Sequence, residues 1–137
     1  MAKTISPKYK TNKEDFRMAE FKFGNFTGEF DALDFDFQKK IEDLSDKMGA
    51  EIGELTKNLD KIKMSDYIKG YCTAIFNFFE DLFDDNDAAN KMFGESVNIK
   101  DCDDAYLCFI EARKKAYAEY QSRALSAINN KQNEKME

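Results

Sequence analysis

The sequence has 137 residues, of which 42% are apolar, and it carries a formal net charge of −6. This length fits a single domain with tails, and no apolar run approaches the ~18 residues that a membrane span requires. An acidic surface repels phosphate backbones, so a nucleic acid is not the expected partner.

The N-terminal segment, residues 1–15, is polar and rich in lysine. It lacks the apolar stretch of a secretory signal, so we expect a flexible lysine-rich arm and a protein that stays in the cytoplasm and is not secreted. In that compartment Cys72, Cys102 and Cys108 are expected to be reduced. Each cysteine lies in an apolar pattern, which predicts that all three are buried.

The next segment predicts a short β-hairpin. Phe21 and Phe23 alternate with polar residues, Gly24-Asn25 is a plausible two-residue turn, and "FTGEF" can form the returning strand. Gly28 interrupts the pattern of that second strand. An isolated hairpin is only marginally stable in water, so we expect this one to pack on helices.

Residues from about 36 to 58 predict a helix with a narrow apolar seam. Its members are spaced three or four residues apart and fall within roughly 80° of one face. They are Ile41, Leu44, Met48, Ile52, Leu55 and Leu59. So narrow a seam predicts contact with one neighbouring helix.

A second predicted helix begins near Ser65 or Asp66, either of which could cap it. Its apolar stripe is about twice as wide, which is typical of the central helix of a small fold. Phe76 and Phe78 lie at the two edges of that stripe, about 80° from its centre, so they are the candidates for exposure. The rings between them, such as Phe79, are expected in the core.

The remaining chain predicts two further helices. Asp84–Asp87 form a turn, residues 88–93 a short helix, and Gly94 its left-handed end. Asp101 is the expected cap of a last helix that continues to residue 128, followed by a frayed polar tail at 129–137. The predicted fold is therefore mainly α, with three to four helices packed in a small bundle, a short N-terminal β-hairpin, and a single domain over residues 16–128.

The residues needed for most catalytic and metal sites are absent from the sequence. There is no histidine, which excludes histidine-activated nucleophiles and histidine metal ligands. The acidic stretches that start at Asp84 and Asp101 do not match a calcium loop, because Ala88 and Ala105 stand at position 5 of the loop, where a ligand is needed. Since no glycine-rich phosphate loop is present either, we expect no enzyme activity, no cofactor and no metal.

Three stretches, "CTAIFNFFEDLFDD", "NKMFG" and "NIKDCDDAYLCFIEA", together resemble the tail-assembly-chaperone-like family of siphophages and prophages of Gram-positive bacteria. The resemblance covers roughly residues 21–120, although relatives usually have a glycine in the turn after the phenylalanine motif. The matching positions are Phe78, Phe79, Leu82, Phe83, Phe93, Gly94, Asn98, Asp101, Cys102, Ala105, Tyr106, Phe109 and Ile110. The resemblance implies a non-enzymatic protein of the host bacterial cytoplasm that binds the tape measure protein before the tail tube assembles.

Two other functions remain open from the sequence. One is a structural or self-assembling phage component, such as a connector or scaffold subunit, and the other is an acidic anti-host regulatory binding protein. A helical chaperone would hold its partner in an apolar groove rimmed by charge. The candidate protein-binding residues are Phe76, Phe78, Ile41, Met48 and Leu55.

Overall fold

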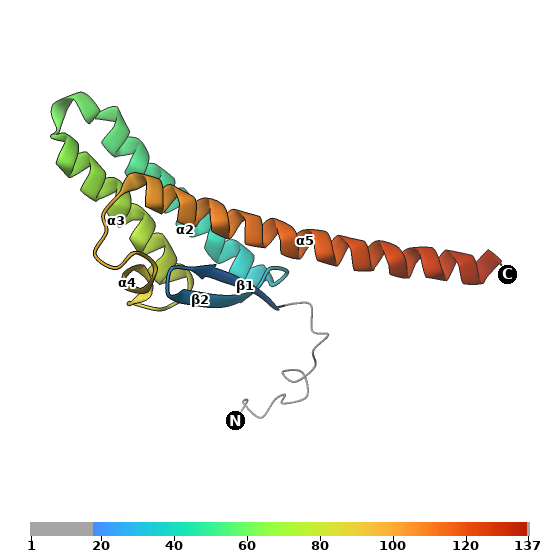
Figure 1. Ribbon diagram of the computed structural model, residues 1–137. Coiled ribbons are helices and arrows are strands. Elements are labelled where there is room, and N and C mark those ends of the chain that lie inside the picture. The colour runs from blue at the N-terminus through green and yellow to red at the C-terminus, as the bar shows by residue number, and fades with distance from the viewer. Residues whose placement is uncertain (1–17, 137) are drawn as a thin grey trace.

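The computed structural model describes the backbone of residues 18–136 and the side chains of residues 18–130. The arm predicted at residues 1–15 lies outside this range. The described residues form a mainly helical fold with an N-terminal two-stranded antiparallel hairpin, as predicted (Figure 1). The elements in order are β1 (Met18–Phe23), β2 (Phe26–Asp31), α2 (Phe35–Lys57), the short 3₁₀ helix η2 (Leu59–Lys61), α3 (Met64–Leu82), α4 (Ala88–Phe93) and α5 (Ile99–Met136).

The hairpin turns at Gly24-Asn25, as its sequence predicts, and Phe23 pairs with Phe26 across the turn. Gly24 has a φ of +59°, and a Cβ there would collide with the backbone of α4. The backbone N–H of Asn25 donates to the carbonyl oxygen of Lys91, at 2.9 Å. The tip of the hairpin is therefore fixed to α4, which supplies the support that two strands alone lack.

Gly28, which interrupts the strand pattern, has a packing role. A Cβ at this position would lie 2.7 Å from the ring of Phe83. That ring in turn lies 5.3 Å from the ring of Phe26, measured between centroids. The glycine thus makes room for an aromatic ring of α3's C-terminal end against the sheet.

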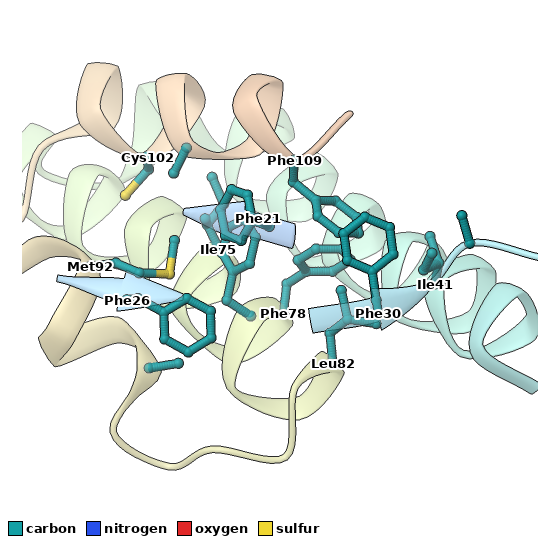
Figure 2. Packing of buried hydrophobic residues seen from close by; sticks show 14 of the residues in the cluster. Phe21, Phe26, Phe30, Ile41, Ile75, Phe78, Leu82, Met92, Cys102 and Phe109 are labelled. Atoms are coloured by element: carbon teal, nitrogen blue, oxygen red, sulfur yellow. The ribbon is translucent and has the colours of Figure 1, made fainter. Parts of the chain in front are cut away.

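One face of the hairpin forms the floor of an aromatic core (Figure 2). The ring of Phe21 stacks on Phe79 of α3 at 5.4 Å and meets the edge of Phe109 of α5 at 5.5 Å. Phe79 is buried, as predicted, and so are Phe109 and Ile75. Full burial of each such side chain stabilises the fold by about 1.5–3 kcal/mol, so this cluster joins the sheet to two helices.

The helices α2 and α3 form an antiparallel pair whose outer ends extend away from the hairpin (Figure 1). The seam of α2 packs on α3, as its narrow width predicts. Asp34 caps α2 by accepting a 3.0 Å hydrogen bond from the N–H of Phe37. The prediction that Ser65 or Asp66 caps α3 is wrong, because the N-cap position is Lys63 and no side chain caps it. At their outer ends the hydroxyl groups of Thr56 and Tyr67 lie 3.1 Å apart and link the pair.

Helix α5 crosses the hairpin and α3, and its C-terminal half extends beyond the rest of the fold (Figure 1). The residue that caps α5 is Asn98, three residues before the predicted cap, Asp101. The side-chain oxygen of Asn98 accepts a 3.0 Å hydrogen bond from the backbone N–H of Asp101. Gly94 ends α4 with a φ of +62°, as expected for a glycine terminator. Residues 129–136, predicted to be a frayed tail, continue the helix to Met136.

Candidate partner-binding groove

Two adjacent open depressions, which share Glu51, Ala74 and Asn77, form a groove along the contact between α2 and α3. The outer depression, between Leu55 of α2 and Gly70 of α3, has a volume of about 600 Å³, and the inner one, beside Phe78, has a volume of only about 10 Å³. On α3 the groove residues point away from Cys72, whose thiol meets that of Cys102 on α5. The groove therefore lies on the side of the helix pair opposite α5, where no other described element covers it.

The floor of the groove is apolar and shallow because the side chains of α3 there are small. Gly70 and Ala74 lie one helical turn apart on the groove side. A Cβ at Gly70 would come within 2.8 Å of the side chain of Leu55, so the glycine is what allows Leu55 to rest against α3. Met48 continues the floor toward the body. Another helix could approach this surface closely, since small side chains reduce the distance between helix axes.

The rim of the groove is mostly acidic. Its carboxylates are Glu51, Glu54, Asp66 and Asp81, and its ammonium groups are Lys47 and Lys69. Glu54 accepts a 3.1 Å hydrogen bond from the side-chain amide of Asn58. Within residues 18–130 none of the four carboxylates forms an ion pair, so the rim carries two unbalanced negative charges.

The five residues predicted to bind a partner do not lie together. Met48 and Leu55 line the groove, as stated above. Ile41 and Phe78 are only 3% and 2% exposed, so the prediction that Phe78 is a candidate for exposure is wrong. Phe76 is half-buried and lies 5.1 Å from the ring of Phe93, away from the groove.

Phe78 is buried because α3 is covered on two sides. Its ring meets Tyr106 of α5 edge-on at 5.5 Å, and it also lies beneath the inner end of the groove. The buried sector of α3 is therefore wider than its apolar stripe. The sequence analysis did not identify Gly70 and Ala74 as groove residues. The signal that could have identified them is a pair of small residues four positions apart beside a polar face.

The acidic turn after α3 is paired with the protein's own lysines. Asp84 lies 3.0 Å from the ammonium group of Lys40, and Asp85 lies 3.0 Å from that of Lys91. The N–H of Asp87 and the ammonium group of Lys91 both donate to Asp85 and lower the pKa of its carboxyl group. The turn thus presents no continuous array of unpaired charge of the kind that a mimic of nucleic acid needs.

The three cysteines lie in two different environments. Burial raises the pKa of the Cys72 and Cys102 thiols, so both stay protonated and unreactive. Cys108, predicted to be buried, is exposed beside a trough of about 570 Å³ between β1 and α5. Across the described part of the chain no three cysteine or acidic side chains gather as a metal site would require. Nor is any described helix both long and apolar enough to span a bilayer.

The comparisons with known proteins give a family. The chain belongs to DUF6673, a family of unknown function, whose model matches residues 21–137. No curated protein and no solved structure matches the chain. The match covers the hairpin's core residues, the groove and all of α5.

Proposed function

We propose that this DUF6673 protein is a non-enzymatic binding protein that holds a helical segment of another protein in the groove between α2 and α3. Following the resemblance of its sequence, we further propose that it is a phage tail assembly chaperone of the bacterial cytoplasm and that its partner is the tape measure protein. The observation that carries the proposal is the uncovered groove with an apolar floor and a charged rim.

The geometry favours a helix as the bound segment. Two antiparallel helices leave a groove on each side, and a third helix lying in it would complete a three-helix arrangement. Its apolar side chains, spaced three and four residues apart, would contact Leu55, Gly70 and Met48. The walls are both helical, so they offer no strand edge to an extended peptide.

The size of the groove fits a partner that is bound and later released. Its floor offers few apolar anchors, and small interfaces with few anchors are typical of weak, transient complexes. A tape measure chain is long and carries an apolar face, so it needs cover until the tail-tube subunits surround it. A chaperone with this groove would provide that cover and then dissociate.

Co-expression tests the proposal directly. A tape measure segment from the same phage or prophage genome is expressed alone, with the wild-type protein, or with Thr73→Trp, which fills the groove from an exposed position. The wild-type protein should raise the soluble fraction of the segment, and Thr73→Trp should not. Thr27→Trp is the matched control, because Thr27 is exposed on the hairpin, away from the groove. Loss of the effect in both variants, or no effect of the wild type, would contradict the proposal.

One observation favours the second candidate, a self-assembling phage component. The part of α5 beyond Tyr117 lies outside the packed body, and it carries Leu125 and Ile128 at 59% and 51% exposure. A solvent-exposed helix of this kind is only marginally stable in isolation, and association would stabilise it. Light scattering at several protein concentrations distinguishes the two, since a stable ring or filament would favour the self-assembling component.

A further inference from the structure

We infer that the segment held in the groove is a basic amphipathic helix of about fifteen residues, with lysine or arginine on both sides of its apolar stripe. This inference rests on the proposed function, and it adds the charge and the length of the partner.

The length follows from the extent of the groove along α3. The groove begins at Asp66 and ends at Asp81. At a rise of about 1.5 Å per residue, this stretch of helix is roughly 22 Å long. A partner helix that lies along the groove therefore contacts it over about four turns, or about fifteen residues.

The charge follows from the two walls of the groove. The α2 wall carries Glu51 and Glu54, and the α3 wall carries Asp66 and Asp81. Because both walls carry carboxylates, a lysine or arginine on either side of the partner's apolar stripe would lie next to one of them. An acidic helix in the same place would bring like charges together on both sides.

The two lysines of the rim do not cancel this preference. Lys47 lies at the inner end and Lys69 at the outer end, and neither is ion-paired within the described residues. Each wall therefore keeps a net charge of −1, from two carboxylates and one ammonium group. Exposed ion pairs are individually weak, so the apolar floor provides affinity while the rim selects among helices of different charge.

Two synthetic peptides test the inference on the full-length protein. Both are helices of about sixteen residues with the same leucine and alanine stripe, flanked by lysine in one and by glutamate in the other. Calorimetry at about 50 mM salt should give the lysine peptide about a tenfold lower Kd, and about 500 mM salt should reduce that ratio to about twofold. Equal affinity for both peptides would overturn the inference and leave the proposed function standing, whereas binding of neither peptide would overturn both.

Reversing the charge of two rim residues tests whether the rim sets the preference for the lysine peptide. The double variant Glu51→Lys with Glu54→Lys should weaken binding of the lysine peptide about tenfold and strengthen binding of the glutamate peptide. The control is Glu29→Lys with Glu111→Lys, which changes net charge equally at exposed sites outside the groove. An equal loss in the control would show that total charge rather than the rim sets the preference, and would overturn the inference.

Discussion

Replacing Phe109 with alanine should remove the side chain of α5 that lies at the centre of the aromatic core. The side chain of Phe109 is fully buried. It lies 5.5–6.2 Å, between ring centroids, from five other rings, namely Phe21, Phe30, Phe78, Phe79 and Phe83. A phenylalanine-to-alanine change in a core costs about 3–5 kcal/mol, because apolar contact is lost and a cavity remains. With rings on every side we expect the upper half of that range.

Urea denaturation followed by circular dichroism measures this cost. Domains of this size have a stability of about 5–15 kcal/mol, so this cost is a large part of the total. In thermal melts the midpoint temperature of Phe109→Ala should fall by roughly 16–20 °C, at about 4 °C per kcal/mol. Leu107→Ala is the control, because Leu107 lies on the same helix at 60% exposure and should change stability by less than about 0.5 kcal/mol. A cost below about 1 kcal/mol for Phe109→Ala would refute the described packing of α5 on the hairpin.

Three smaller predictions concern single residues. Gly24→Ala should destabilise the protein by about 1–3 kcal/mol, because the φ of Gly24 is positive and the new Cβ would collide with α4. Gly53→Ala should instead stabilise it by about 0.5–1 kcal/mol, because a Cβ at Gly53 meets nothing within 4 Å. Urea denaturation measures both changes. Burial and the 2.6 Å hydrogen bond to Asp103 raise the pKa of Tyr71, so its contribution to stability is complete below the ordinary value of 10.0 and declines as the pH rises above it. The stability of a Tyr71→Phe variant should therefore decline less steeply above pH 10.0 than that of the wild type, as measured by thermal melts at several pH values. A thiol reagent should label Cys108 alone in the native protein, and mass spectrometry that finds two or three labels would contradict the described burial.

The elements were predictable because each one's own residues carry the signal. The seam of α2 repeats every three or four residues, and the turn at Gly24-Asn25 closes two alternating strands. These features depend on local backbone geometry and on one buried face. The sequence therefore predicts the type and order of the elements and most of their bounds to within a few residues, although α5 continues beyond its predicted end at residue 128 to Met136.

Caps were less predictable, because several residues near each boundary could accept the same hydrogen bond. Asn98 and Asp101 both suit the start of α5. The loop after Gly94 places Asn98, not Asp101, at the cap position of α5. The side chain of Asp101 instead accepts a 3.2 Å hydrogen bond from the hydroxyl of Ser96. The choice between them depends on the path of the loop, which composition does not report.

The groove was only half predictable for a related reason. A stripe on one helix shows how much apolar surface the helix has, but it does not show which neighbours cover it. Met48 and Leu55 were correctly placed on a surface shared with one neighbour, whereas Phe78 was at the edge of its stripe and is covered by α5. Gly70 was overlooked, because a residue without a side chain leaves no mark in a hydrophobic pattern, yet its contact with Leu55 shapes the floor.

The arrangement of α2 and α3 explains why a binding surface can persist without weakening the fold. The inner half of α3 is fixed by the aromatic core, through rings such as Phe79, so the pair does not depend on its outer half for stability. The outer half of α3 packs on α2 and contacts α5 only through residues near its middle, such as Tyr71 and Cys72. Leu55 therefore remains beside an open groove. A partner helix would bury only a few further side chains there, and after the entropic cost of association this leaves a modest net affinity. A groove built in this way would bind reversibly, as a chaperone that must give up its partner requires.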